Sequence, residues 1–167
     1  AAGEFGQMTI DKNGLKTAHS FRGSLESLAS RTGIVRCFRK AVLEGEETML
    51  QEELGPHLTG VRSRHLRIAL AERDPLAKRI VKQAAEDTGI GVAAIISAIG
   101  PEYVMINGGV IEALHKAMLP VIRKTAAAHV LPGTMDGIKI EVSKLGDDGG
   151  IHGAAILASE EEGTGKR

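Results

Sequence analysis

Two carboxylates near the start of the chain have the chemistry best suited to a binding site. Glu4 begins the run EFGQ, and Glu26 closes the run RGSLE after a loop punctuated by glycines. A carboxylate accepts several hydrogen bonds, so two of them facing one pocket suit vicinal hydroxyls, the pattern that a sugar presents. Taken singly, Glu4 is better explained as a solvated loop residue. Glu26 is better explained as a first-turn helix residue, which the helix dipole favours.

Two glycine clusters in the second half are candidates for ligand contact or for close packing. Gly108 and Gly109 follow a short apolar run and precede a helical pattern, a place where missing side chains let a nucleotide lie against the backbone. A tight strand-to-helix turn explains the same spacing equally well. Gly149, Gly150 and Gly153 open a final apolar helix, and we expect them to permit close helix packing rather than to contact phosphate.

Three segments, taken in order, resemble one protein family. Residues 4–30 (EFGQMTIDKNGLKTAHSFRGSLESLAS) resemble the sugar-binding and zinc-binding segment of the ROK family, which comprises bacterial sugar kinases and sugar-responsive repressors. Residues 99–114 (IGPEYVMINGGVIEAL) look like the family's strand, double glycine and helix at the nucleotide site. Residues 145–158 (LGDDGGIHGAAILA) look like its closing glycine-to-helix motif. Glycine-rich turns are common, so the resemblance depends on all three segments in the family's order.

The resemblance implies roles for five residues. Glu4, Gln7 and Glu26 are expected to bind the hydroxyls of a hexose or an N-acetylhexosamine. Gly108 and Gly109 are expected to contact the adenosine of ATP, which the parent kinase would use with Mg. In the family's kinases the catalytic aspartate and the first phosphate-binding segment lie in an N-terminal lobe. We therefore expect no catalytic residue in this chain, which resembles the C-terminal half of a longer protein, either a fragment or a degenerate relative.

The zinc site of the family is degenerate in this sequence. The resemblance places a zinc-binding histidine at the position of Gln7 and three cysteines at the positions of Thr17, His19 and Ser24. Structural zinc is held by four cysteine or histidine donors, and only His19 retains that character. We therefore predict that no zinc binds here. The loop must then be ordered by packing around Phe21 and by hydrogen bonds.

Composition excludes several classes of function. The 167 residues include 21 basic and 21 acidic ones, so no net charge draws the whole surface to nucleic acid or to an anionic membrane. The arginines of residues 62–73 are interpreted as a solvated helix face. The single cysteine, Cys37, excludes an intrachain disulfide and is expected to be buried. No apolar run is long enough to span a bilayer, and we expect a cytoplasmic protein. No serine, cysteine or threonine lies in a recognisable nucleophile motif, which argues against a hydrolase.

The elements that must position these residues follow from apolar periodicity. Alternation predicts short strands at residues 6–11, 103–106 and 138–142, the first ending in a turn at 12–14. Helical spacing predicts a helix from residue 24 onward, broken near Gly33, and a surface connection or short helix at 44–57. Ser63 is a candidate N-cap for the next helix, and Asp74 with Pro75 begins a long buried helix that contains Gly89 and Gly91. Two further helices are expected, one at 110–130 and one after Gly149.

These elements predict an α/β fold. By resemblance it is an actin-like, ribonuclease H-like C-terminal lobe, rich in helix and with an incomplete short sheet. We expect one lobe over residues 1–167, with a sugar-loop segment at 1–30, a helical segment at 31–100, a nucleotide-side α/β segment at 101–159 and a frayed tail at 160–167.

Three functions follow from the resemblance. The first is the sugar- and nucleotide-binding lobe of an ATP-dependent hexose kinase, incomplete without the N-terminal lobe. The second is the effector-binding half of a sugar-sensing transcriptional repressor, the one case in which nucleic acid would be a partner. The third is a remnant that only forms homodimers, as family members do through this half. The sequence does not identify the sugar.

Overall fold

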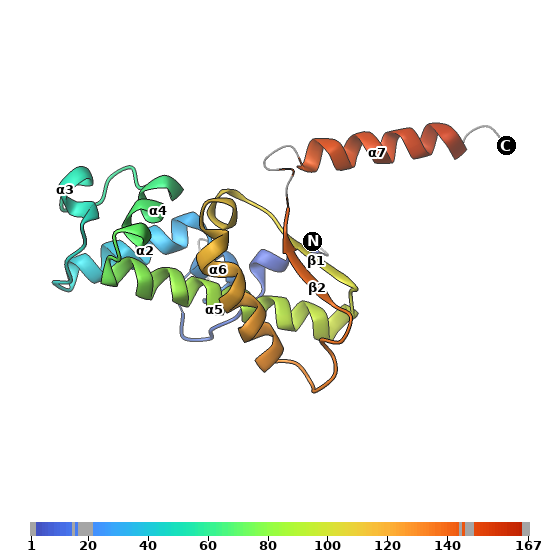
Figure 1. Cartoon of the computed structure of the whole chain (residues 1–167), viewed down its shortest axis with the longest axis horizontal. Coiled ribbons are helices and arrows are strands. Elements are labelled where there is room, and N and C mark those ends of the chain that lie inside the picture. Colours follow the sequence, from blue (N-terminus) through green and yellow to red (C-terminus); the bar gives the residue numbers. More distant parts are fainter. Residues whose placement is uncertain (1–2, 15, 17–21, 144, 146–148, 165–167) are drawn as a thin grey trace.

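The computed structural model describes residues 3–14, 16, 22–143, 145 and 149–164. Helices dominate the fold, and a small parallel sheet lies at one side (Figure 1). In chain order the elements are η1 (Phe5–Gln7), α1 (Leu25–Ala29), α2 (Arg31–Leu43), α3 (Leu50–Leu54), α4 (Ser63–Ala71), α5 (Pro75–Ile99), β1 (Tyr103–Ile106), α6 (Gly109–Ala128), β2 (Lys139–Val142) and α7 (Gly149–Thr164). The sequence-based expectation of a helix-rich α/β fold with a short sheet agrees with this architecture.

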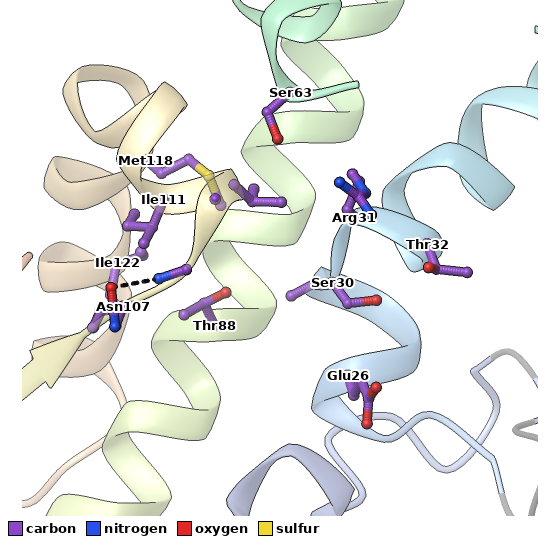
Figure 2. A pocket seen from close by; sticks show the side chains of 15 residues that line it. Glu26, Ser30, Arg31, Thr32, Ser63, Thr88, Asn107, Ile111, Met118 and Ile122 are labelled. Atoms are coloured by element: carbon purple, nitrogen blue, oxygen red, sulfur yellow. Dashed lines mark hydrogen bonds between the residues drawn. The ribbon is translucent and has the colours of Figure 1, made fainter. Parts of the chain in front are cut away.

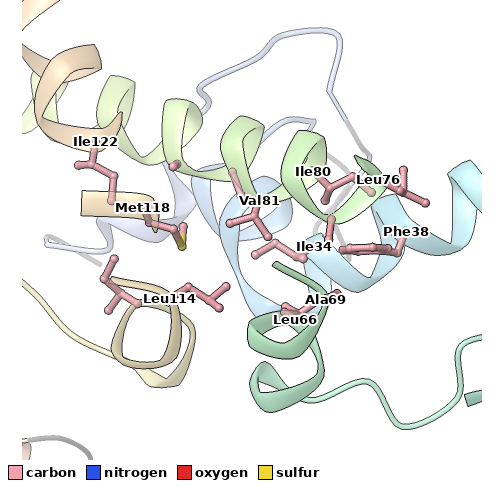
Figure 3. Packing of buried hydrophobic residues seen from close by; sticks show 14 of the residues in the cluster. Ile34, Phe38, Leu66, Ala69, Leu76, Ile80, Val81, Leu114, Met118 and Ile122 are labelled. Atoms are coloured by element: carbon pink, nitrogen blue, oxygen red, sulfur yellow. The ribbon is translucent and has the colours of Figure 1, made fainter. Parts of the chain in front are cut away.

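The core lies between α5 and the helices packed around it. Apolar side chains from α2, α4, α5 and α6 meet in one cluster, which includes Ile34, Phe38, Leu66, Val81 and Met118 (Figure 3). Each of these five side chains is at most 2% exposed. Burial of this apolar surface is the main favourable term that holds the helices together.

The two glycines inside α5 let neighbouring helices approach closely, as the sequence predicted. A Cβ atom at Gly89 would lie 2.6 Å from the Cβ of Thr125 and 2.9 Å from the carbonyl oxygen of Ile122, both on α6. A Cβ atom at Gly91 would lie 2.8 Å from a methyl carbon of Leu25 on α1. These positions set the distance from α5 to its two neighbours.

The Gly89→Ala variant is expected to be less stable than the wild type by roughly 1–3 kcal/mol. The new methyl group would collide with backbone and a β-branched side chain of α6, and this overpacking outweighs the ~1 kcal/mol that alanine gains over glycine in a helix. Urea denaturation followed by circular dichroism measures the change. Gly153→Ala is the control and should lose no stability, because a Cβ at Gly153 would meet nothing within 4 Å. A Gly89→Ala variant that is as stable as the wild type would contradict the packing account.

The sheet consists of β1 and β2, joined in parallel by α6. Tyr103 pairs with Lys139 and Ile106 with Val142 in the register. On α6, Arg123 donates two hydrogen bonds to the carbonyl oxygen of Ile140, at 2.9 and 2.6 Å. The helix is therefore held against β2.

The predicted strand at residues 6–11 is wrong. Phe5–Gln7 forms a turn of 3-10 helix, in which the amide of Gln7 donates to the carbonyl oxygen of Glu4 at 3.0 Å. Within this stretch Thr9 makes an isolated bridge with Ser24. Pairing goes no further because Gly23, with a φ of +61°, turns the partner segment away, and its carbonyl oxygen accepts from both Ile10 and Asp11. The turn at 12–14 is confirmed by a 3.0 Å bond from the amide of Gly14 to the carbonyl of Asp11.

Two predicted helix boundaries also shift. The break after α1 lies at Ser30 rather than at Gly33, which is buried inside α2. The hydroxyl of Ser30 accepts from the amide of Gly33 at 3.1 Å, so Ser30 caps α2 and is the single residue between the two helices. At α4, Arg62 occupies the N-cap position and Ser63 is the first helical residue. The start of α5 at Asp74 and Pro75 is as predicted.

The last helix differs most from expectation. α7 continues to Thr164, so the helix includes most of the segment predicted to be frayed. It projects from the rest of the molecule (Figure 1), and its residues 150–159 are exposed. A Cβ at Gly150 or Gly153 would meet nothing within 4 Å, which contradicts the predicted close packing at these two glycines. No helix in the described part of the chain is both long enough and apolar enough to cross a membrane.

Two ionisable groups lie near the N-terminal loop: Cys37, which is partly buried, and Asp87, which is buried. Cys37 is half-buried rather than buried, and burial raises the pKa of its thiol. Asp87, on α5, is 8% exposed, and Gln83 donates to its carboxylate at 3.1 Å. Burial is the main cause of a raised pKa at Asp87, with a smaller contribution from the charge of Asp11, while the bond from Gln83 opposes the shift.

The raised pKa of Asp87 predicts a pH-dependent cost to stability. The folded state holds the proton more tightly than the unfolded chain, so stability falls as pH rises from ~3.9 through the folded-state pKa. Asp87→Asn should remove this cost, and its gain in stability over the wild type should be larger at pH 7 than at pH 4. Urea denaturation at the two pH values measures the difference. A gain that is equal at pH 4 and pH 7 would contradict the prediction.

Candidate functional site

The structure brings two of the three predicted sugar-binding residues together. The side-chain nitrogen Nε2 of Gln7 donates a hydrogen bond to Oε2 of Glu26, although the two residues are 19 positions apart in the sequence. Glu26 lies in the first turn of α1, whose start is fixed by the buried hydroxyl of Ser24 accepting from the amide of Ser27 at 3.2 Å. Glu4 precedes η1 and its carbonyl closes the turn that carries Gln7.

A cavity of about 460 Å³ opens beside Glu26. One wall comes from α1 and the start of α2, with Glu26, Ser30 and Arg31 (Figure 2). The opposite wall comes from the end of β1 and the first turns of α6. Gly108 and Gly109 lie in this second wall, so one cavity contains both a predicted sugar residue and the two predicted nucleotide residues. Glu4 and Gln7 are outside its lining.

The floor of the cavity is apolar and belongs to the core. Ile111, Met118 and Ile122 of α6 are at most 5% exposed and face the space between the walls (Figure 2). Small-molecule sites commonly combine such an apolar floor with a few polar groups at the rim. The floor suits a flat, weakly polar ring.

The start of α6 has the backbone conformation that a close ligand requires. Gly108 has a φ of +119°, and its amide donates to Oδ1 of Asn107 at 2.9 Å. No side chain caps α6, and a Cβ at Gly108 or Gly109 would meet nothing within 4 Å. The sequence suggested a tight strand-to-helix turn at Gly108 and Gly109, and the structure has one. The turn also leaves open space in front of the backbone.

Six polar residues of the lining were not identified as site residues from the sequence. They come from four separate parts of the chain, so no local motif joins them all: Ser30, Arg31, Thr32, Ser63, Thr88 and Asn107. The hydroxyl of Thr88 donates to the carbonyl of Ala84 at 2.7 Å and retains its capacity to accept. Arg31 had a detectable signal, since a cation in the first turn of a helix opposes the helix dipole.

Two of the four degenerate zinc positions can be described. Gln7 bonds to Glu26, and Ser24 is 1% exposed and caps α1, so both side chains have structural partners. Thr17 and His19, together with Phe21, lie outside the described residues. The absence of zinc therefore stays a prediction.

The cavity suits a nucleotide better than it suits a metal ion alone. Open backbone at Gly108 and Gly109, the apolar floor and the N-terminus of α6 fit a purine and its phosphates. Among the described lining residues Glu26 is the only carboxylate. Magnesium is commonly held by one or two carboxylates together with substrate phosphates, so it would depend largely on the phosphates here.

Comparison with known proteins agrees with the geometry. The model of the ROK family matches residues 1–161. The glucokinase of Halalkalibacterium halodurans is 31% identical over 165 residues, which cover 98% of this chain and 49% of that protein. The xylose repressor of Caldicellulosiruptor bescii is 28% identical, over 93% of this chain and 38% of that protein.

A solved structure shares the fold. The ROK family glucokinase from Streptomyces griseus, crystallised with glucose and AMPPNP, superposes with a TM-score of 0.78 at 26% identity, over 94% of this chain and 51% of that one. The chain spans about half the length of the curated glucokinases it matches. With a family match over nearly its whole length, this chain belongs to the ROK family.

Proposed function

We propose that this chain is the C-terminal sugar- and nucleotide-binding lobe of an ATP-dependent hexose kinase of the glucokinase type. One observation carries the proposal: a single cavity has Glu26 on one wall and Gly108 and Gly109 on the other. A phosphotransferase must hold its two substrates side by side, and a cavity lined by both kinds of predicted binding residue supports such an arrangement. The glucokinase that shares the fold was crystallised with glucose and AMPPNP.

The binding groups divide between the two substrates. Glu26 accepts hydrogen bonds from sugar hydroxyls, Gln7 orients its carboxylate, and Glu4 contributes a second carboxylate from the adjacent turn. The purine lies on the apolar floor against Gly108 and Gly109. Transfer of the γ-phosphoryl group to a hexose hydroxyl depends on positioning and on stabilisation of charge. The catalytic aspartate comes from the N-terminal lobe, as the family resemblance implies.

Unsatisfied surfaces support the assignment as one lobe of a larger protein. Tyr103 and Met105 of β1 are 46% and 57% exposed, although a parallel sheet is normally covered on both faces. α7 carries Ile151 and Leu157 at 70% and 64% exposure. Apolar groups on this scale are typical of surfaces that meet other parts of a protein, whether the other lobe or the second subunit of a homodimer.

The proposal is tested by calorimetry on this chain. Glucose, N-acetylglucosamine, N-acetylmannosamine and a non-hydrolysable ATP analogue are titrated separately. We expect heat for at least one sugar and for the nucleotide. We expect no turnover in a coupled kinase assay, because the proposal assigns the catalytic aspartate to an N-terminal lobe. Turnover by this chain, or no heat with any of the four ligands, would contradict the proposal.

The effector-binding half of a sugar-sensing repressor is the second candidate. The match to a xylose repressor over 93% of this chain favours it. The two functions differ in the nucleotide, because a repressor half needs the sugar and not ATP. Heat with a sugar, xylose included, but none with the ATP analogue would favour the repressor. Codons upstream that encode a winged helix, rather than a phosphate-binding segment, would favour it independently.

A further inference from the structure

Helix α2 carries an unusual excess of positive charge for a chain with no net charge. Its 13 residues include Arg31, Arg36, Arg39 and Lys40 and no acidic residue. Lys40 pairs with Glu44 at 3.8 Å. The three arginines have no carboxylate within ion-pair distance in the described part of the chain. Helix surfaces more often interleave the two signs of charge, so this uncompensated group requires a reason.

The three arginines line one cavity. It has a volume of about 400 Å³, and its wall is completed by backbone and side chains of α2 and of the segment at Gly60 and Val61. No acidic residue lies in the described lining, which we call the arginine cavity. Arg31 and Thr32 also line the cavity in front of Gly108, so the two spaces are neighbours. Arg36 and Arg39 do not line the cavity in front of Gly108, although Arg39 also lines a separate hollow beside His57.

Backbone carbonyls hold two of the guanidinium groups in place. Arg39 donates through Nε to the carbonyl of His57 and through Nη2 to that of Leu58, each at 3.2 Å. Arg36 donates through Nη1 to the carbonyl of Lys16 at 3.3 Å. A carbonyl orients a guanidinium but does not neutralise its charge. A guanidinium has five N–H donors, so the bonds described for Arg36 and Arg39 use only some of them, and Arg31 donates to no other residue that the structure describes.

We propose that the arginine cavity binds a phosphate dianion, either inorganic phosphate or the phosphate group of a monoester such as a hexose 6-phosphate. Like charges repel, and a solvated helix face would let flexible arginines spread apart; here carbonyl bonds hold two of them at a shared hollow. Guanidinium groups match the oxygens of phosphate in a bidentate geometry, and such charge-assisted bonds are about twice as strong as neutral ones. The inference does not rest on the kinase proposal, since a phosphate site is compatible with either function.

Calorimetry with inorganic phosphate and with glucose 6-phosphate tests the site, at constant ionic strength with chloride as the reference anion. The wild type should bind, and Arg36→Gln should weaken the affinity about tenfold, the equivalent of one charge-assisted hydrogen bond. Equal affinity for both ligands indicates recognition of free phosphate, and tighter binding of the ester indicates an additional sugar contact. Absence of binding by the wild type, or equal affinity in wild type and variant, would overturn the proposal.

Two further variants keep the result interpretable. Arg67→Gln removes an exposed arginine of α4 that lines neither cavity, and it should bind phosphate as the wild type does. Arg31→Gln removes a side chain with no described hydrogen bond, so it should fold normally and still lose phosphate affinity. Arg36→Gln should leave binding of the ATP analogue unchanged. The phosphate site can therefore fail without the proposed nucleotide site failing, and the reverse is also true.

Discussion

Glu26→Gln is expected to lower hexose affinity by about 10- to 100-fold. Glu26 is the only carboxylate in the described lining of the 460 Å³ cavity, and its Oε2 already accepts from Gln7. Glutamine keeps the size of the side chain but removes the negative charge and one acceptor. Its NH2 group would also oppose the amide of Gln7 in one of its two orientations. Hydrogen bonds to charged groups contribute about 1.5–3 kcal/mol each, which corresponds to this loss.

The measurement is calorimetry with the hexose that the wild type binds most tightly. Glu72→Gln at the end of α4 is the matched control, since that exposed glutamate makes no described side-chain contact and lies outside the cavity. Binding of the ATP analogue should be unchanged in both variants. Equal sugar affinity in Glu26→Gln and Glu72→Gln would exclude Glu26 from sugar recognition.

Asp74→Ala should destabilise the chain by roughly 3–5 kcal/mol, the largest effect on stability that we predict. Asp74 is 6% exposed and caps α5, with Oδ1 accepting from the amide of Ala77 at 2.7 Å. Its Oδ2 accepts from the hydroxyl of Thr48 and the amide of Met49, both at 2.8 Å, and so ties α3 to the central helix. Alanine would leave three donors without a partner, and each buried orphan costs about 1–3 kcal/mol.

Graded variants separate the cap from the tie to α3. Asp74→Asn retains an acceptor oxygen for the amide of Ala77. Its loss in free energy of unfolding should therefore be about half of the loss caused by Asp74→Ala. Thr48→Val removes one donor together with its need for a partner and should cost least of the three. Urea denaturation gives the free energies of unfolding. A loss below about 0.5 kcal/mol for Asp74→Ala would show that α5 does not depend on this carboxylate.

The regular elements were predictable because their signals are local. Asp74 followed by Pro75 identifies the start of α5, since the side chain caps the helix and proline loses no hydrogen bond at its first position. The apolar run at β1 and the spacing of α6 were also sufficient, and the buried glycines of α5 indicated close helix contact. For the starts and spacing of the helices and for β1, the residues that decide the structure lie within a few positions of one another.

The N-terminal loop could not be predicted because distant residues decide it. Alternation at residues 6–11 suggested a strand, but a strand needs a partner, and Gly23 turns the segment that pairs with Thr9 away after one bridge. The hydrogen bond from Gln7 to Glu26 was equally hard to predict, because 19 residues separate the two partners in the sequence. Gly33 was misread as a break because glycine has low helix propensity, whereas Ser30 supplied the stronger signal as a cap.

Only part of the candidate site was accessible from sequence. Glu26, Gly108 and Gly109 were found through motifs, and the structure places all three on one cavity. Ser63 and Thr88 reach the cavity from α4 and α5 only through the packing of those helices. The arginine cavity was also hidden, because residues 31, 36 and 39 do not follow a simple helical stripe and become neighbours of Gly60 only in the folded chain.

The most direct test of the central claim is a structure of this chain bound to glucose and a non-hydrolysable ATP analogue. The account predicts a sugar whose hydroxyls contact the carboxylate of Glu26 and a purine against the backbone of Gly108 and Gly109, both within the same cavity. Ligands bound at separate surfaces, or a sugar that leaves Glu26 in solvent, would contradict it.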